Sequence, residues 1–399
     1  MNIAAQLDAL REAGLYRRTQ LISGPQGPRV MLDGKPVLLL CSNNYLGFAD
    51  HPRVREAAAD AAMRWGVGAG ASRLVSGTMT IHEQLEARLA QFEGTESCLL
   101  FGSGYLANVG VLTALGREGQ TIFSDALNHA SLIDGCRLAR AETFVYDHCD
   151  LEHLGWALRE RGREGDVIVT DSVFSMDGDI APLAEIVALA RRHGALVVVD
   201  EAHATGALGP GGRGAVAAAG LEGEVDVIVG TLSKALGCYG GYVCASREIV
   251  DLLLNSARSV IYSTAPPPPV VAGALAALEM LIEQPLRPQK LQAQADVLRE
   301  ELRAAGVAAP GGATQIIPLI VGDADAAMAM SAAALARGVF AQAIRPPTVP
   351  VGSSRLRLTV MASHTSSELA AAAVALRAAA EDAGVQIAAG SSVPVARAA

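Results

Sequence analysis

Between about residue 50 and residue 265, short apolar runs alternate with longer amphipathic stretches. Runs such as DVIVT (166–170) and ALVVV (195–199) are apolar throughout rather than at every second position. A continuous apolar run is typical of a strand that is buried on both faces of a parallel sheet. The stretch APLAEIVALARRHG (181–194) predicts a helix that stops at Gly194. The pattern therefore predicts an α/β fold with a mostly parallel sheet. The other runs predicted as its strands are SCLLF (97–101), TIF (121–123), TFVY (143–146), DVIVG (226–230) and GYVCA (241–245).

The pattern changes at the tetraproline stretch APPPPV (265–270). Proline disfavours the helix interior and biases the preceding residue away from it, so this stretch predicts a hinge between domains. Two helices (270–283, 288–306) and two apolar strands (316–321, 355–360) are then expected to form a smaller α+β unit. The predicted parts are an N-terminal helix and segment (1–48), a large domain (49–265), a small C-terminal domain (266–385) and a flexible tail (386–399).

Charge and hydropathy exclude several classes of partner. The 32 basic and 41 acidic residues give a net charge of −9, which argues against binding to nucleic acid or to an anionic membrane. Although mean hydropathy is +0.30, no run of about 20 uninterrupted apolar residues predicts a membrane span. The N-terminus carries Asp8 and Glu12 and lacks the apolar region of a secretory signal. Six cysteines without a C-x-x-C pair fit a reducing compartment, so we expect a cytoplasmic protein.

Lysine is scarce, because only Lys35, Lys234 and Lys290 occur among the 32 basic residues. Arginine replaces lysine as a surface charge, but its guanidinium does not readily form an imine. Lys35 lies in a D-G-K-P turn and Lys290 in a polar stretch, and both are expected to be solvated. Lys234 follows the strand DVIVG (226–230) and precedes a glycine-rich turn. Partial desolvation there would lower its pKa and free the amine for Schiff-base chemistry.

Asp200 and His203 come directly after the predicted strand 195–199, in the string VDEAHATG. Open α/β sheets place ligand groups at this end of their strands. Asp200 could pair with a buried cation, such as a protonated ring nitrogen, or it could simply cap the strand end. Asp-Glu-Ala-His also spells the metal-binding box of one helicase group. A nucleic-acid motor of that kind needs a phosphate-binding G-x-x-x-x-G-K-[ST] loop, which this sequence lacks.

The string FGSGYLANVG (101–110) follows another predicted strand and opens a helix. Gly102 and Gly104 let the backbone approach an anion, and the free N–H groups of the first helical turn can bind phosphate. The same string fits G-x-G-x-x-A with Asp125 at the end of the next run, which is typical of a dinucleotide-binding dehydrogenase. That alternative would leave Lys234 unexplained.

Two further polar groups follow predicted strands, His129 in NHAS and Ser175 in SVFSMDGD. His129 could stack on a flat heteroaromatic ring or merely cap a helix. Ser175 could donate a hydrogen bond to a phosphate or a ring oxygen, or lie in an ordinary Asp-Gly turn. A strand-end lysine, a strand-end Asp-x-x-His, a glycine-rich helix start and a stacking histidine are together the parts needed to hold pyridoxal 5'-phosphate.

These strings resemble the α-oxoamine synthases, which are pyridoxal-phosphate enzymes of the aspartate-aminotransferase fold (PLP fold type I). The resemblance covers about residues 30–375 and rests on CSNNYLGF, SRLVSGT, NHAS, VFSMDGD, VDEAHATG, TLSKALG and IYSTAPP. Enzymes of this family condense an amino acid with an acyl thioester and release CO2 and free thiol. The segment AIRPPTVPVGSSRLRLT (343–359) is most similar to the biotin-pathway members, which use L-alanine and pimeloyl-CoA or pimeloyl acyl carrier protein. The alternative is a member that uses glycine with acetyl-CoA or succinyl-CoA.

The resemblance implies a role for each matching residue. Lys234 would hold the cofactor covalently and remove the α-proton of the substrate. Asp200 would pair with the pyridine nitrogen, His203 with the ring hydroxyl, and His129 would stack on the ring and contact the substrate. The other matching positions are Gly104, Tyr105, Ser175, Thr231 and Thr264 for the cofactor and Arg17, Thr348 and Arg357 for the substrate.

Two of these matches carry further implications. Arg357 would grip the carboxylate of the amino acid bidentately, a geometry that suits guanidinium. Thr264 would reach the cofactor of a second subunit, which implies a homodimer with shared active sites. One position departs from the family pattern, because Asp171 stands where glutamate is expected.

Overall fold

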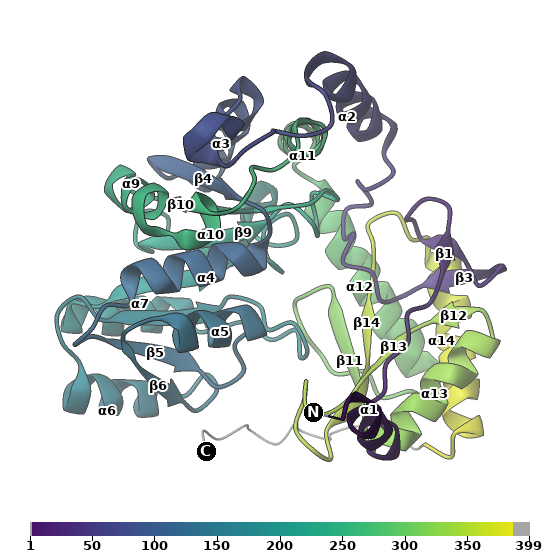
Figure 1. The fold of residues 1–399 in the computed structure, drawn as a ribbon. Helices are drawn as coiled ribbons and strands as arrows, with labels where there is room; N and C mark the ends of the chain where they lie inside the picture. Colours follow the sequence, from purple (N-terminus) through teal and green to yellow (C-terminus); the bar gives the residue numbers. More distant parts are fainter. Residues whose placement is uncertain (1, 386–399) are drawn as a thin grey trace.

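The computed structural model describes residues 2–385 of the chain, and its largest element is a seven-stranded sheet (Figure 1). In spatial order the strands are β4 (Ser97–Phe101), β10 (Gly241–Ala245), β9 (Val227–Thr231), β8 (Leu196–Asp200), β7 (Val167–Asp171), β5 (Thr121–Asp125) and β6 (Glu142–Tyr146). Five neighbouring strands, from β9 to β6, pair in parallel, while β10 is antiparallel to both of its neighbours. The predicted runs and the mostly parallel sheet are therefore confirmed.

Both faces of this sheet are covered by helices, which explains why its strands are apolar throughout. Along β8, Val197 and Val199 belong to one apolar core, whereas Val198 between them belongs to another. The first core includes residues of α3, α6, α7 and α11, and the second includes residues of α4, α5, α9 and α10. These helices are α3 (Thr80–Glu93), α4 (Gly104–Leu115), α5 (Ala130–Leu138), α6 (Leu151–Arg161), α7 (Leu183–His193), α9 (Arg247–Ser256), α10 (Arg258–Ile261) and α11 (Pro268–Glu283). As predicted, α7 ends at Gly194, which adopts the left-handed conformation.

The C-terminal part contains an antiparallel sheet of β11 (Ile316–Gly322), β14 (Ser354–Thr359) and β13 (Gln342–Ile344). Its helices are α12 (Arg287–Ala304), α13 (Ala324–Ala336) and α14 (Ser366–Asp382). The predicted strands at 316–321 and 355–360 and the helix at 288–306 are confirmed.

The N-terminal residues pack with this C-terminal part (Figure 1). A second small sheet joins β1 (Ile22–Ser23), β2 (Arg29–Leu32) and β3 (Lys35–Leu39) to β12 (Val339–Phe340). Helix α1 (Ile3–Glu12) precedes these strands, where the sequence predicts a helix. The three short N-terminal strands were not predicted.

The tetraproline stretch forms the beginning of a helix. Pro267 is the N-cap of α11, and Pro268 and Pro269 occupy its first turn, where proline is tolerated. Helix α11 packs on α2 (Pro52–Trp65) and α3, and the chain then bends by 82° before α12, which packs on α14. A domain division at residue 266 stays a prediction, and the predicted tail, 386–399, lies outside the described residues.

Within residues 2–385, no single helix is long and apolar enough to cross a membrane; only the bent pair α11 and α12, taken together, meets the length and composition criteria.

Candidate active site

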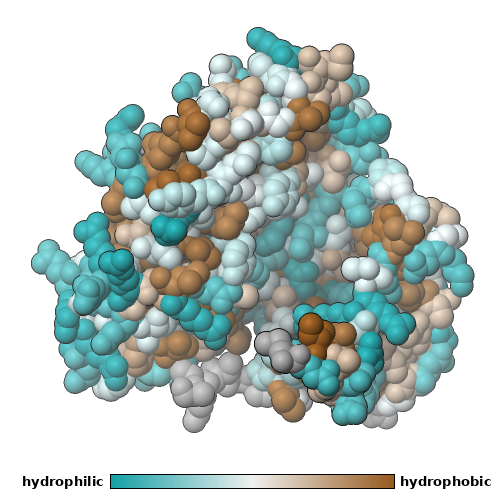
Figure 2. Space-filling view, viewed as in Figure 1, coloured by the Kyte–Doolittle hydropathy of each residue, from teal (hydrophilic) through white to brown (hydrophobic). Residues whose placement is uncertain are grey.

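A cavity of about 280 Å³ lies between the strand ends of the large sheet and the C-terminal sheet. Its lining residues are Cys41, Asn43, His129, Ser175, Met176, His203, Lys234, Gln342, Ile344 and Arg357. The molecular surface is hollowed between the larger and the smaller body in the same view (Figure 2). The fold thus brings five of the predicted site residues, far apart in the sequence, to one cavity.

Lys234 is the amine in this cavity. It follows β9 by three residues and is partly buried. Burial lowers the pKa of Lys234 to about 8, while the charges of Asp200 and Asp171 raise it and that of Arg357 lowers it further. Near physiological pH a larger fraction of this amine is therefore neutral than of an exposed lysine. The neutral amine is the form that attacks a carbonyl group.

Asp200 ends β8 and is 5% exposed. Its carboxylate accepts hydrogen bonds of 2.6 Å from Asn108 Nδ2 and 2.8 Å from the Ala202 N–H. A carboxylate buried so deeply needs a cation nearby. Lys234 supplies one charge, and the protonated nitrogen of a heteroaromatic ring would supply another.

His129 is the N-cap of α5, and its Nδ1 accepts a hydrogen bond of 3.2 Å from the Ser131 N–H. The His129 N–H donates to Asp171 Oδ2 at 2.7 Å. Burial lowers the pKa of His129, so the ring is neutral, and the residue lines the cavity. Asp171, the residue that departs from the family pattern, therefore holds the backbone that carries this ring.

His203 and Arg357, which line the cavity, form a buried polar cluster with Tyr45 behind them. His203 Nδ1 lies 2.6 Å from Tyr45 Oη, and Arg357 donates to Tyr45 Oη at 3.4 Å, to Asn43 Oδ1 at 3.2 Å and to the Ser175 carbonyl. Burial, with Lys234 and Arg357 next, lowers the pKa of His203 well below its usual value. Sequence reasoning assigned no role to Tyr45 or Asn43, although both lie in the string CSNNYLGF that carried the family resemblance.

The N-terminus of α4 lies against the end of β9. A Cβ atom on Gly104 would be 3.5 Å from Thr231 Cβ, so the first turn of α4 and the Thr231 side chain are neighbours. The first N–H groups of a helix have no intrahelical partners and favour an anion. Tyr105 also lies in this turn, but its side chain is exposed and donates to Asp134 Oδ2 at 2.6 Å.

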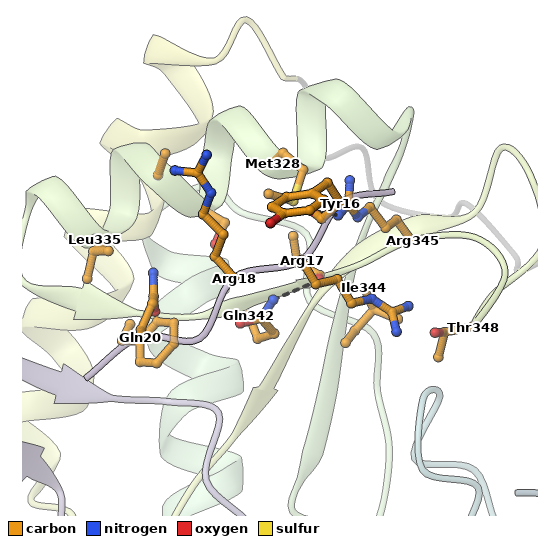
Figure 3. A pocket seen from close by; sticks show the side chains of 14 residues that line it. Tyr16, Arg17, Arg18, Gln20, Met328, Leu335, Gln342, Ile344, Arg345 and Thr348 are labelled. Atoms are coloured by element: carbon orange, nitrogen blue, oxygen red, sulfur yellow. Dashed lines mark hydrogen bonds between the residues drawn. The ribbon is translucent and has the colours of Figure 1, made fainter. Parts of the chain in front are cut away.

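A second cavity, of about 670 Å³, lies next to the first and shares Gln342 and Ile344 with it (Figure 3). Arg17 and Thr348 line this second cavity rather than the one with Lys234. The Arg17 side chain extends toward Thr348, whereas Arg18 points the other way (Figure 3). Arg17 and Thr348, both predicted to bind substrate, therefore share one cavity, while Arg357 lines the other.

Thr264 is exposed and forms an isolated bridge with Ser72. It lines neither of the two cavities. Within one chain, the described residues therefore give Thr264 no place beside Lys234.

The donors at the first cavity fit pyridoxal phosphate. Lys234 offers an amine for the aldehyde, the nearby Asp200 a carboxylate for the ring nitrogen, and His129 a flat face. The start of α4, next to Thr231, offers N–H donors for the phosphate. The orphaned polar atom Asn108 Oδ1, buried beside Asp200, shows that the polar network there is incomplete among the described residues.

Comparisons with known proteins agree with this chemistry. Residues 35–376 match the family model for aminotransferase class I and II. An 8-amino-7-oxononanoate synthase of Citrifermentans bemidjiense is 54% identical, with 93% of this chain and 96% of the relative aligned. The enzyme of the same name from Geobacter sulfurreducens is 51% identical, with coverages of 94% and 97%.

Solved structures show the same likeness. A high-resolution structure of SPT with a PLP internal aldimine superposes with a TM-score of 0.91 at 33% identity, over 96% of this chain and 97% of that chain. The 8-amino-7-oxononanoate synthase of Francisella tularensis superposes with a TM-score of 0.75 at 25% identity, over 87% of this chain and 98% of that chain.

Proposed function

The chain belongs to the class I and II aminotransferases and, within them, to the pyridoxal-phosphate-dependent 8-amino-7-oxononanoate synthase family, and from this premise we propose that it condenses L-alanine with a pimeloyl thioester. The products would be 8-amino-7-oxononanoate, CO2 and the free thiol. One observation carries the proposal: Lys234 and Arg357, each matching a family position, line one cavity together with two neutral imidazoles, and the buried Asp200 carboxylate acts on Lys234 by its charge. The reaction serves biotin biosynthesis, and we expect it to take place in the cytoplasm.

When bound, pyridoxal phosphate supplies an electron sink that stabilises negative charge on the α-carbon of the amino acid. The residues of this chain do the rest. The Lys234 amine would hold the cofactor and, once released from it, would remove the α-proton of L-alanine. Asp200 would keep a proton on the ring nitrogen, and His129 would pack on the ring face.

Arg357 would orient the substrate through its carboxylate. Its guanidinium is fixed by Asn43 and by the Ser175 carbonyl, so its direction is set before a ligand arrives. Two parallel hydrogen bonds from guanidinium suit a carboxylate, which is the group later lost as CO2. The acyl donor would approach through the larger neighbouring cavity, where Arg17 offers charge for an anionic group and Phe340 and Leu335 offer apolar surface.

A homodimer with shared active sites is part of the proposal. Thr264 is exposed beside other exposed residues, and they include large apolar side chains that water does not favour: Leu74 and Val75 in the turn 73–77, and Tyr262. An isologous interface would cover these residues and carry Thr264 toward the cofactor of the partner.

Inter-subunit complementation tests this arrangement. Lys234→Ala and Thr264→Arg should each be inactive alone. After the two are unfolded together and refolded, mixed dimers should contain one intact site and recover roughly a quarter of wild-type activity. No recovery, with mixed dimers present by mass spectrometry, would contradict the shared site.

The activity is tested by release of thiol from pimeloyl-CoA with and without L-alanine. Trapping with borohydride, followed by peptide mass spectrometry, should place the reduced cofactor on Lys234. Lys290→Ala is the control, because Lys290 is exposed. Turnover of glycine with acetyl-CoA or succinyl-CoA, but not of alanine with pimeloyl-CoA or pimeloyl acyl carrier protein, would contradict the substrate pair and leave the family assignment intact.

A further inference from the structure

We propose that Tyr45 is a positioning residue, which fixes the tautomer of His203 and links His203 to Arg357. The inference deepens the proposed function and rests on it in one respect: it takes a cofactor ring oxygen and a substrate carboxylate as the groups that His203 and Arg357 meet. Tyr45 itself is fully buried and is not among the residues that line the cavity. It acts through two residues that do.

The contacts of the Tyr45 hydroxyl determine where its proton points. Tyr45 Oη lies 2.6 Å from His203 Nδ1, 3.1 Å from Asn43 Oδ1 and 3.4 Å from Arg357 Nη2. A guanidinium only donates, so the hydroxyl oxygen accepts from Arg357 and keeps its one proton for another partner. Asn43 Oδ1 already accepts from Arg357 Nη1 at 3.2 Å. The amide oxygen has a second lone pair, so it is the other acceptor within reach of the Tyr45 proton, at 3.1 Å. The contact to His203 Nδ1 is shorter, at 2.6 Å, and we assign the Tyr45 proton to it.

This direction of donation fixes the form of His203. The charged and titratable groups that influence His203 are Lys234, Arg357 and His129; together with burial they lower its pKa, so its ring is neutral. A neutral imidazole carries one proton, and a ring whose Nδ1 accepts must carry that proton on Nε2.

The remaining ring nitrogen is then a donor toward the ligand. No hydrogen bond from Nε2 of His203 to a residue among 2–385 is described, and His203 lines the cavity. A protonated Nε2 donates to an oxygen anion on a bound ring. The other tautomer would present a lone pair to the same oxygen and repel it.

The backbone around Tyr45 explains how the hydroxyl is held. The Tyr45 carbonyl accepts from the Ala362 N–H at 2.7 Å, just beyond β14, and Thr359 Oγ1 donates to the Ser42 carbonyl at 2.7 Å. Arg357 belongs to β14, and His203 follows β8. Tyr45 thus joins the strand that carries the carboxylate-binding arginine to the loop that carries the cofactor-binding histidine.

The first test needs no mutation. In protein labelled with ¹⁵N-histidine, with and without bound pyridoxal phosphate, His203 should show a protonated Nε2 and an unprotonated Nδ1; loss of its signal in His203→Gln assigns it. A protonated Nδ1 in the wild-type protein overturns the proposal, whether or not Tyr45 variants fold.

The second test compares Tyr45→Phe with Tyr146→Phe, the same change at a tyrosine that is buried outside the cavity. A donor to the ring oxygen favours its anionic form. Loss of that donor in Tyr45→Phe should raise the midpoint of the pH titration of the bound cofactor's visible band by roughly one pH unit. In Tyr146→Phe the midpoint should not move.

The outcomes distinguish a positioning role of Tyr45, a merely structural role of Tyr45, and a failure of the proposed function. A lower melting temperature for Tyr45→Phe without a change of midpoint would leave Tyr45 a merely structural role and overturn the proposal. A wild-type protein that forms no visible band with pyridoxal phosphate would contradict the proposed function instead. In that case the ¹⁵N spectrum still decides whether Tyr45 sets the His203 tautomer.

Discussion

Asp171 and Asp200 lie opposite each other at the ends of the adjacent parallel strands β7 and β8. Both are buried, and each accepts a hydrogen bond from the group beside it: Asp171 from the His129 N–H and Asp200 from Asn108. Burial, and then the charge of Asp200, raises the pKa of Asp171 well above its usual value. One carboxyl group therefore positions the histidine ring, while its neighbour is free to pair with a cation in the cavity.

This pair predicts the effect of restoring the glutamate that the family pattern leads us to expect. In Asp171→Glu, one extra methylene must fit where the residue is 3% exposed, so the free energy of unfolding should fall by about 1–3 kcal/mol. The His129 backbone should also shift, which would lower kcat more than it changes KM for L-alanine. Urea unfolding and steady-state kinetics measure the two effects. Asp251→Glu, on the exposed face of α9, is the control. Equal stability of Asp171→Glu and wild type would show that the site has room for the larger side chain.

The lowered pKa of Lys234 predicts how fast the cofactor-free protein captures pyridoxal phosphate. The neutral amine is the attacking form, and with a pKa of about 8 roughly a tenth of it is neutral at pH 7. The capture rate should rise tenfold per pH unit below this value and level off above about pH 8. Stopped-flow absorbance across pH 6–10 measures the profile. A rate that still rises steeply at pH 10 would indicate an unshifted lysine.

His148 predicts an alkaline loss of stability near the turn that carries Ser175. Its ring bridges Asp125 at 2.9 Å and Asp179 at 2.8 Å. Burial opposes the charged form, but these hydrogen bonds dominate and raise the pKa of His148 to about 12. The native state therefore keeps a proton that the unfolded chain releases above pH 6.5. The contribution of His148 to the free energy of unfolding is full below pH 6.5 and declines as pH rises toward 12.

His148→Gln should lower the free energy of unfolding by about 2–3 kcal/mol at pH 6 and by less at pH 9. Denaturant unfolding at both pH values measures the difference. His193→Gln, at the end of α7, serves as the matched control. A penalty that stays constant with pH would mean that the bridge is not charged.

Glu93 predicts a loss of stability with rising pH at a second buried site. It is 3% exposed and accepts a hydrogen bond of 2.6 Å from Tyr242 Oη. Burial raises the pKa of Glu93 to about 8, so its contribution to stability is full below pH 4.5 and is lost as pH rises through 8.

Glu93→Gln removes this dependence. The free energy of unfolding of the variant, relative to that of the wild type, should therefore rise by about 2–4 kcal/mol between pH 5 and pH 9. Thermal or urea unfolding at the two pH values measures the gain. Glu83→Gln, on the exposed face of the same helix, should show none.

The large sheet was readable from the sequence because burial on both faces removes polar residues from every position of a strand. Val197, Val198 and Val199 face two different cores, and only a continuous apolar run satisfies both. The strands β1 to β3 lack this signal, since they are short and partly exposed. Their partner, β12, lies near the other end of the chain, and local patterns do not report such pairing.

The residues of the site also differ in how far the sequence predicts them. Lys234 and Asp200 were found because strand ends in an α/β sheet converge on one edge. Tyr45 follows no strand of the large sheet and contacts no ligand position directly, so no local pattern indicates it. Arg17 and Thr348 line a neighbouring cavity, and Thr264 lies on the surface, where the position of a second chain would decide its role.

The contacts between the segment after β3 and strand β14 have a consequence for synthesis on the ribosome. The Ser42 carbonyl, just after β3, accepts a hydrogen bond from Thr359, which is synthesised 317 residues later. Tyr45 likewise accepts one from Arg357. The large sheet is complete long before these partners emerge. The strands of the central layer are thus synthesised early, but the cavity cannot close until nearly all of the chain has been translated.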